Sequence, residues 1–365
     1  MPFTKHNRFK PSLYWLLIFL PIAVWAEHAR PDSHRLIFIA ACLAIIPLAG
    51  LLGLATEHIA ARAGEGLGGF LNATFGNAAE LIIAIVALIG GQVDVVKASL
   101  TGSIIGNVLL VLGASFLAGG IRHTVQKFNP VGAVSQASTL SIAAIALIVP
   151  AAFHYLGKGL ITADLEQDLS LILSMVLLSL YLLSLLFSLH THRKLFSSVE
   201  HYNNSSEHTE EPWSTQKSIF YLLGSSALIA WMSEILVGSV AQAANEMGMS
   251  QVFVGVIVVA IVGNAAEHST AIIMALKNRL DLSLGIGIGS STQIALFVAP
   301  LLVILSYAIA TQPMDLVFTR GELLVVVFSV FILNQIAVDG TSTWFKGVQL
   351  LAVYTIIAVA FYFIP

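Results

Sequence analysis

Long apolar runs separated by short polar connections dominate the chain from end to end. Eleven segments are mostly apolar, and their expected bounds are 12–26, 35–57, 67–92, 97–120, 130–153, 168–190, 217–243, 249–276, 282–309, 321–338 and 344–364. About 18 consecutive apolar residues are enough for a helix to span the hydrocarbon core of a bilayer. The pattern therefore predicts an all-α polytopic membrane protein with about eleven transmembrane helices.

The composition agrees with a membrane protein. Of the 365 residues, 57% are hydrophobic and only 10% are charged, whereas ordinary soluble domains carry roughly a quarter. The net charge of −3 and the absence of a basic patch with interleaved aromatic residues argue against nucleic-acid binding. Cys42 is the single cysteine, so no intramolecular disulfide forms. We expect a lipid bilayer around the chain and no bound cofactor, and we leave a homo-oligomer open.

The distribution of Lys and Arg predicts how the helices are oriented. The first apolar segment has no small-residue cleavage site before Arg30 and Pro31, which favours a membrane span over a signal peptide. With the N-terminus inside, the inner side carries twelve Lys and Arg and the outer side five: Lys5, Arg8, Lys10, Arg62, Arg122, Lys127, Arg193, Lys194, Lys217, Lys277, Arg279 and Lys346 against Arg30, Arg35, Lys97, Lys158 and Arg320. Because positive residues favour the cytoplasmic side, the N-terminus is predicted to be cytoplasmic. The short N-terminus and compact loops favour a bacterial inner membrane.

Two short motifs divide the chain into related halves. Gly76-Asn-Ala-Ala-Glu80 recurs 187 positions later as Gly263-Asn-Ala-Ala-Glu267, and the same offset places Gly102-Ser103 on Gly289-Ser290. Five spans per half is an odd number, so the halves enter the membrane from opposite sides. Inverted repeats of this kind are typical of secondary transporters, which bind substrate near the bilayer midplane. The predicted organisation is a leading helix (1–33), a first five-helix repeat (34–190), a polar cytoplasmic linker (191–216) and a second five-helix repeat (217–365).

Each motif carries an acidic residue deep inside an apolar helix. The nearest charged neighbours of Glu80 in the sequence are Glu65 and Asp94, which at ~1.5 Å of rise per residue lie ~20 Å away along a helix. Ionised groups at that depth are costly and usually face a water-filled cavity or an ion pathway. We therefore expect Glu80 and Glu267 to meet near the midplane as two halves of one site.

The residues around these carboxylates predict an all-oxygen cation site. Gly and Asn before each Glu are poor helix formers, so each helix is expected to break there and free carbonyl oxygens. Oxygen-only sites of irregular geometry suit Ca²⁺, and no thiolate is near for a soft metal. The expected metal ligands are Glu80, Glu267, Asn77, Asn264, Ser103, Ser290, Gln293 and Asn107. The alternative is that the glycines only allow close helix packing and the hydroxyls bond their own helix backbone.

The candidates for proton coupling are Glu80, Glu267 and His268. Desolvation and mutual repulsion both favour a neutral carboxyl group, so the empty site is expected to bind protons and a divalent cation to expel them. Such competition for one site is the physical basis of antiport. His268 stands where the first half has Leu81, and its alternatives are proton carrier, gate residue or packed interface residue. The His and Glu residues of the linker suggest metal sensing, but a solvated linker is the preferred interpretation.

At these motifs the chain resembles the Ca²⁺/H⁺ antiporters of the cation exchanger (CAX) family, within the Ca²⁺:cation antiporter superfamily. The matching stretches are 71–82 and 262–268, followed by 102–113 and 289–297. The resemblance implies alternating access, with Glu80 and Glu267 as the carboxylates of the exchanged ions. Two features depart from the family: Ala260 stands where it often has Pro, and the central loop lacks a long acidic run.

The resulting prediction is a secondary active antiporter that exchanges cytoplasmic Ca²⁺, or a related divalent cation, for H⁺. The alternative of the same fold is a Na⁺-coupled or Mn²⁺-selective exchanger; Ser, Asn and Gln in the fourth and ninth spans favour protons, by the same resemblance. An intramembrane acid hydrolase would also use paired carboxylates, but no H-E-x-x-H or G-x-S-x-G motif occurs, so no enzyme activity is expected. Duplication of the motif argues against a purely structural role.

Overall fold

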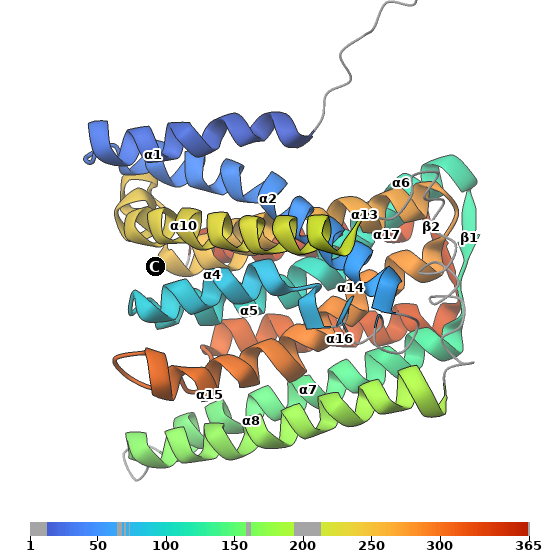
Figure 1. The fold of residues 1–365 in the computed structure, drawn as a ribbon. Coiled ribbons are helices and arrows are strands. Elements are labelled where there is room, and N and C mark those ends of the chain that lie inside the picture. Colours follow the sequence, from blue (N-terminus) through green and yellow to red (C-terminus); the bar gives the residue numbers. More distant parts are fainter. Residues whose placement is uncertain are drawn as a thin grey trace, which may run out of the picture.

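The computed structural model describes residues 13–63, 68, 71–72, 74–157, 162–192 and 213–363. Within these ranges the chain is a bundle of long helices that run side by side (Figure 1). In chain order the elements are η1 (Leu13–Ile18), α1 (Phe19–Ala29), α2 (His34–Ala63), α4 (Ala78–Ile89), α5 (Val93–Ile105), η2 (Gly106–Val111), α6 (Leu112–His123), β1 (Val125–Lys127), α7 (Pro130–Gly157), α8 (Ala163–Leu186), η3 (Phe187–Thr191), α10 (Thr215–Met247), α11 (Gln251–Phe253), η5 (Val254–Val259), α12 (Ala260–Gly263), α13 (Ala265–Leu276), α14 (Leu280–Gln293), η6 (Ile294–Val298), α15 (Ala299–Ile309), α16 (Arg320–Asp339), β2 (Thr341–Thr343) and α17 (Trp344–Phe363). Segment η1 is a 3₁₀ turn, and the other η segments are π-helical.

The described residues contain eight helices that are long and apolar enough to cross a membrane, and a ninth candidate is a bent pair of helices. The predicted leading span forms a shorter apolar helix, Leu13–Ala29. The predicted span 67–92 is described mainly at its end, in α4, because most of 64–73 lies outside the described residues. The prediction of a polytopic helical bundle is confirmed, whereas the count of eleven spans is not.

Local sequence signals set where several helices begin. The side chains of Thr162, Ser214 and Thr319 accept hydrogen bonds from the first-turn backbone amides of α8, α10 and α16. At α16 the capping is reciprocal, because Glu322 bonds back to the Thr319 amide. Such caps satisfy amides that have no partner inside the helix.

The structure repeats with the offset seen in the sequence. Helix α4 maps onto α13, and the π-helical segment η2 maps onto η6 with both ending at equivalent residues, Val111 and Val298. The halves also interlock: α2 packs against α10, α6 against α17 and α8 against α15. Each half therefore completes its core only by packing against the other.

A two-stranded sheet joins the halves at one end of the bundle, and the all-helical prediction missed it. Strand β1 pairs antiparallel with β2, with Gln126 opposite Ser342. Gln126 is buried and donates to the Ala275 carbonyl at 2.8 Å. Three-residue strands in polar loops carry no periodicity that a sequence pattern can reveal. We call this end of the bundle the sheet end.

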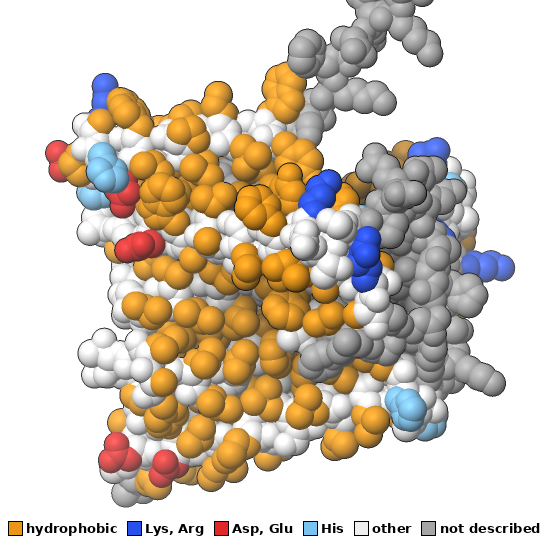
Figure 2. All heavy atoms as spheres, viewed as in Figure 1, with side chains coloured by type: hydrophobic (Ala, Val, Ile, Leu, Met, Phe, Trp, Pro, Cys, Tyr) orange, Lys and Arg blue, Asp and Glu red, His pale blue; other side chains and the backbone are white. Residues whose placement is uncertain are grey.

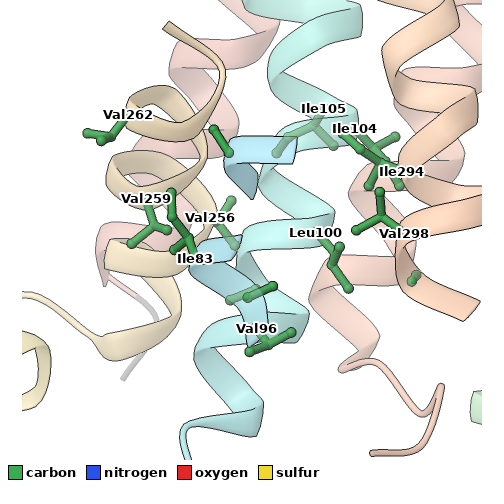
Figure 3. Close-up of a cluster of buried hydrophobic side chains, with 14 of the residues drawn as sticks. Ile83, Val96, Leu100, Ile104, Ile105, Val256, Val259, Val262, Ile294 and Val298 are labelled. Atoms are coloured by element: carbon green, nitrogen blue, oxygen red, sulfur yellow. The ribbon is translucent and has the colours of Figure 1, made fainter. Parts of the chain in front are cut away.

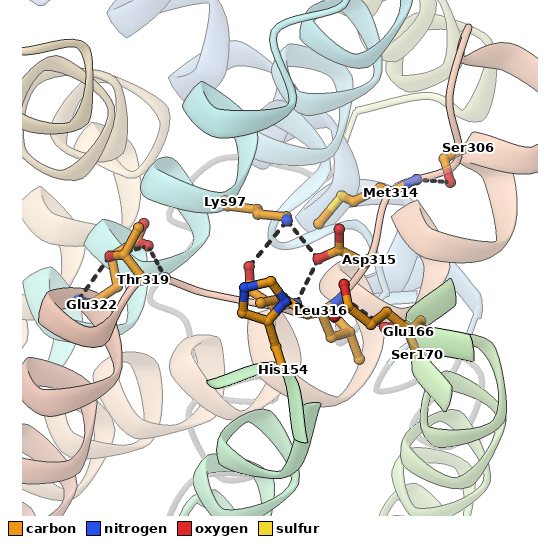
Figure 4. Close-up of polar contacts among 11 residues, drawn as sticks. Lys97, His154, Glu166, Ser170, Ser306, Met314, Asp315, Leu316, Thr319 and Glu322 are labelled. Carbon is orange, nitrogen blue, oxygen red and sulfur yellow. Dashed lines mark hydrogen bonds and ion pairs between the residues drawn. The ribbon is translucent and has the colours of Figure 1, made fainter. Parts of the chain in front are cut away.

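At the opposite end an extended segment, the 310–319 strap, crosses between α15 and α16 (Figure 4). Its alternate side chains Met314, Leu316 and Phe318 are buried. Lys97 of α5 donates to Asp315 Oδ1 at 2.6 Å and to the Val317 carbonyl at 3.0 Å. The strap belongs to the second half but is fastened to a helix of the first.

The surface has the layered pattern of a membrane protein. Figure 2 shows a broad apolar belt, with Lys and Arg mainly toward the sheet end and Asp and Glu toward the strap end. Large exposed apolar side chains, such as Ile145, Phe153 and Leu183, belong to this belt. Exposed apolar area of this extent is stable only in lipid or under a partner.

Candidate ion-binding site

Both glutamate motifs interrupt their helices, as the sequence predicted. Gly76 and Asn77 form a turn, and Asn77 caps α4 with φ −95° and ψ 27°. Asn264 separates α12 from α13 with φ −92° and ψ 5°, and the helical stretch Gln251–Gly263 differs in direction from α13 by 63°. The bend forms with Ala at position 260, so it does not require a proline there.

The two motifs face each other, and each glutamate lies against the glycine of the other motif. A Cβ atom built on Gly263 would lie 3.2 Å from Glu80 Cγ and 3.6 Å from Glu80 Oε1. A Cβ atom built on Gly76 would lie 3.4 Å from Glu267 Oε1. The two carboxyl groups therefore lie between the same two motifs. Because a side chain at either glycine would press on a carboxylate, glycine leaves the room that each Glu occupies.

The asparagines of the motifs are exchanged between the halves in the same way. Asn264 Nδ2 donates to Ser103 Oγ at 2.9 Å, and Ser290 Oγ donates to Asn77 Oδ1 at 2.7 Å. Each asparagine thus bonds a serine from the opposite repeat. All four side chains are buried, so these bonds form in a medium of low dielectric constant, where they are strong.

Several buried polar atoms at the site have no hydrogen-bond partner among the described residues. They are Glu80 Oε1 and Oε2, Glu267 Oε2, Asn77 Nδ2, Asn264 Oδ1 and Gln293 Nε2. Leaving a buried polar atom unsatisfied costs about 1–3 kcal/mol, so a cluster of them marks a place built for an occupant. Four of the six are oxygens, which suits a hard cation.

Irregular backbone surrounds the site. The π-helical segments η2 and η6 follow Ser103 and Ser290, and η5 precedes the second motif. Single-turn π-helices are frequent at functional sites, because they shift side chains off the regular helical register. Here η2 carries Asn107, and η6 begins directly after Gln293.

Buried apolar side chains pack together next to the site, and Figure 3 shows this cluster. Along α5, Lys97 contacts the strap and Ser103 lies at the site, so Leu100 lies between them. Leu100 packs within a cluster of buried side chains that includes Ile83, Val96, Val256, Val259, Ile294 and Val298. An apolar layer is a barrier to ions, and this one lies on the strap side of the site.

All eight predicted ligands come together at this place. Gln293 Oε1 lies 3.8 Å from the Cβ position of Gly76, next to Glu267. Asn107 reaches the site through Ser290, to which its Nδ2 donates at 3.0 Å. His268 joins through Asn107, with Nε2 3.2 Å from Asn107 Oδ1. Their roles in ion binding stay predictions, because the structure contains no ion.

The predicted glycine roles divide between the two repeats. A Cβ atom on Gly102 would overlap the backbone of Val256, whereas one on Gly289 would meet nothing within 4 Å. Close packing therefore explains Gly102 but not its repeat partner Gly289.

Sequence reasoning overlooked Tyr181 of α8. Its hydroxyl is hydrogen-bonded to the Thr74 side chain, and its ring stacks on Phe297 at 5.1 Å between centroids. The available signal was the one Tyr in residues 177–186, which are otherwise Leu and Ser. Through its hydrogen bond to Thr74, Tyr181 supports the residues just before the first motif.

The alternative of a metal-sensing linker falls mostly outside the described residues, because 193–212 are not among them. Across the described ranges, no group of three or more His, Cys, Asp or Glu side chains is arranged to hold a metal ion. A site with two carboxylates and otherwise amide and hydroxyl groups agrees with that result.

Comparison with known families decides the classification. The family described as "Sodium/calcium exchanger protein" matches residues 34–190 and 217–363. The chain belongs to this family. Each matched stretch of this exchanger-family chain contains one glutamate motif.

Individual members of the exchanger family are similar over nearly the full length. The chain is 45% identical to a "Ca(2+)/H(+) antiporter" of Synechocystis sp., over 96% of this chain and 96% of that protein. It is 44% identical to the "Ca(2+)/H(+) antiporter ChaA" of Bacillus subtilis, over 89% and 92%. The solved structure of native YfkE superposes with a TM-score of 0.83 at 38% identity, covering 97% of this chain and all of that one.

Proposed function

We propose that this chain is a secondary active antiporter that moves Ca²⁺ out of the cytoplasm in exchange for H⁺. The observation that carries the proposal is the pairing of Glu80 and Glu267, brought from opposite repeats to one buried place. The near full-length similarity to proteins named Ca²⁺/H⁺ antiporters supports the choice of ions. Exchange of ions between compartments requires no bond-making chemistry, so no catalytic residue is assigned.

Mutual exclusion at the two carboxylates provides the coupling. Two ionised carboxylates supply much of the charge that Ca²⁺ needs, and amide and hydroxyl oxygens complete its six to eight ligands. In the proposed site Asn264 Oδ1, which has no partner among the described residues, is the amide oxygen best placed to bind. When Ca²⁺ leaves, the two carboxylates repel each other and bind protons instead. One site therefore carries either metal or protons across the membrane.

Transport then follows alternating access. The apolar layer around Leu100 lies on the strap side of the site, so exchange with that side requires the layer to part. Inverted repeats provide two equivalent closures, one for each side of the membrane, because each half can adopt the conformation of the other. The protein switches access from one side of the membrane to the other when the site holds Ca²⁺ or protons. It does not switch when the site is empty and charged, since two unpaired carboxylates in an apolar interior are costly.

The sheet end is proposed to face the cytoplasm. The loops at that end carry most of the Lys and Arg in the described chain, including Arg122, Lys127, Lys277, Arg279 and Lys346. Positive residues are retained on the cytoplasmic side during insertion. This orientation places the N-terminus inside, and bacterial relatives support a plasma membrane location.

Transport of ⁴⁵Ca²⁺ into proteoliposomes tests the proposal. An imposed pH gradient, acid inside, is expected to drive uptake that collapses when an ionophore removes the gradient. Replacing the proton gradient by a Na⁺ gradient tests the Na⁺-coupled alternative, and competition by Mn²⁺ tests the Mn²⁺-selective one. Uptake that follows the Na⁺ gradient and ignores the pH gradient would reject proton coupling.

A further inference from the structure

The two repeats do not contribute equally to the polar surroundings of the site. Three polar side chains there have apolar partners or glycine at the equivalent position 187 residues away. The pairs are His268 with Leu81, Asn107 with Ile294, and Gln293 with Gly106. Because α4 and α13 begin and end at equivalent residues, this comparison is in register. The departures from symmetry therefore mark what only one side of the site needs.

Asn107 connects two of the groups on that side. Its side chain is 1% exposed, so both of its polar atoms need partners inside the protein. Nδ2 donates to Ser290 Oγ at 3.0 Å, and Oδ1 lies 3.2 Å from His268 Nε2. Each polar atom of the amide thus has a partner, His268 on α13 and Ser290 on α14, and these two contacts fix its orientation.

Ser290 links Asn107 to the residues of the ion site. Its hydroxyl donates to Asn77 Oδ1 at 2.7 Å and lies within hydrogen-bonding reach of Glu267. The Ser290 hydroxyl therefore accepts from Asn107 and donates its one proton to Asn77. The series His268, Asn107, Ser290 and Asn77 forms one buried hydrogen-bonded chain beside Glu267.

The Glu80 side has no such chain. Neither carboxylate oxygen of Glu80 has a hydrogen-bond partner in the described part of the protein. Ser103, the repeat partner of Ser290, accepts from Asn264, and the residue at the position equivalent to Asn107 is the apolar Ile294. A hydrogen-bonded chain therefore lies beside the Glu267 carboxylate, and the described residues form no equivalent chain beside Glu80.

We infer that Asn107 is a positioning residue rather than a cation ligand: it ties His268 to Ser290 and thereby holds the Glu267 side of the site in its binding geometry. The inference deepens the proposed antiport and rests on it. A preorganised side lowers the cost of gathering ligands around the ion.

The repeat itself supplies the test variant. Asn107→Ile combined with His268→Leu places at both positions the residues that the other half carries, and removes both partners of the 3.2 Å contact together. Removing a polar pair together avoids leaving one buried partner unsatisfied, so the double variant is expected to fold. Size-exclusion elution and thermal unfolding of the purified variants check this.

The measurement is the Ca²⁺ dependence of uptake driven by a pH gradient, which separates KM from the maximal rate. For the double variant KM is expected to rise about tenfold, the factor that the loss of about one net hydrogen bond gives, with the maximal rate kept within about threefold. His268→Leu alone is expected to raise KM by less than the double variant does. His268→Gln keeps a donor for Asn107, so its KM is expected to lie close to that of the wild type. Asn334→Leu is the matched control. Asn334 donates to Ser141 with a donor–acceptor distance of 2.8 Å, and neither residue belongs to the site. The KM of this variant should equal that of the wild type.

Two results overturn the inference. If the double variant has the same KM as the wild type, the contacts of Asn107 with His268 and Ser290 do not position the site. The second result is that Asn107→Ile alone raises KM as much as the double variant does, while His268→Leu leaves KM unchanged. The double-mutant cycle then shows no coupling between the two side chains, which means that Asn107 is itself a ligand. Absence of wild-type uptake under a pH gradient would instead reject the proposed function, so the two failures are distinct.

Discussion

Glu80 of the first repeat packs against Gly263 of the second, with the Cβ position of Gly263 only 3.2 Å from Glu80 Cγ. Glu267 makes the equivalent contact with Gly76. Each motif therefore supplies both a carboxylate and the space for the other carboxylate. The spacing of three residues between Gly and Glu follows from this geometry, because the glycine lies at the break and the glutamate one turn beyond it.

Substitution of Gly263 is expected to disturb the site without unfolding the protein. In Gly263→Ala the new methyl group forces the Glu80 side chain to shift by a few tenths of an ångström. The expected cost of this shift is about 1 kcal/mol, which corresponds to about a fivefold rise in KM for Ca²⁺. The KM from gradient-driven uptake measures this. Gly224→Ala in α10, where a Cβ atom meets nothing within 4 Å, is the control. Equal KM values for the two variants would refute the packing argument.

The repeat-equivalent glycines Gly102 and Gly289 are expected to respond differently. A Cβ atom on Gly102 overlaps the Val256 backbone, and backbone cannot rotate away, so Gly102→Ala should cost about 3 kcal/mol or more. Gly289→Ala meets no atom within 4 Å and should be tolerated. Thermal unfolding in detergent is expected to show a Tm lowered by about 5 °C or more for the first variant only. Similar Tm values would show that α5 and η5 do not approach as closely as described.

The Lys97–Asp315 ion pair is expected to fasten the 310–319 strap. Lys97 is 12% exposed and its partner 29%, so Lys97→Met strands a partly buried carboxylate at a cost of about 1–3 kcal/mol.

Lys346 provides a matched control for this pair, because it also bonds an aspartate, Asp339 at 2.6 Å, and a carbonyl two residues later. Its pair is more exposed, at 26% and 50%, so Lys346→Met should change stability by less than about 1 kcal/mol. Thermal unfolding compares the two variants. A Tm of Lys97→Met equal to that of the wild type would mean that the strap is held by its apolar side chains alone.

Protons on the Ca²⁺-loading side are expected to compete with Ca²⁺. Since both ions need the same carboxylates, lowering pH on that side raises the apparent KM for Ca²⁺ and leaves the maximal rate at saturating Ca²⁺ unchanged. Initial rates of uptake at several external pH values, with the size of the pH gradient held constant, measure this. A fall in maximal rate at constant KM would place the protons at a separate site.

Much of the fold was predictable because membrane helices must satisfy their backbone internally, so apolar length alone reveals them. The predicted span 282–309, for example, corresponds to α14, η6 and α15. The break at Asn264 was also predictable, since Gly and Asn are intrinsically poor helix formers. The offset of 187 residues, visible in two motifs, holds in the structure for helices that carry no motif, such as α6 and α15.

The features that the sequence did not predict depend on long-range contacts. The β1–β2 pairing joins residues from separate loops and has no local periodicity. The reciprocal Asn–Ser bonds follow from how the repeats cross, which no spacing reports. Asn107 and Gln293 could be nominated as polar residues in the paired spans, but only coordinates show that Asn107 spends both polar atoms on His268 and Ser290.

The central claim is that Glu80 and Glu267 together hold the exchanged ion. Uptake of ⁴⁵Ca²⁺ driven by a pH gradient, compared among wild type, Glu80→Gln, Glu267→Gln and the distant control Asn334→Leu at equal amounts of folded protein, tests it directly. Each glutamine variant is expected to lose gradient-driven uptake by at least about a hundredfold, because an amide retains the shape but neither the charge for Ca²⁺ nor the proton. Uptake in either glutamine variant at the level of the wild type would contradict the account.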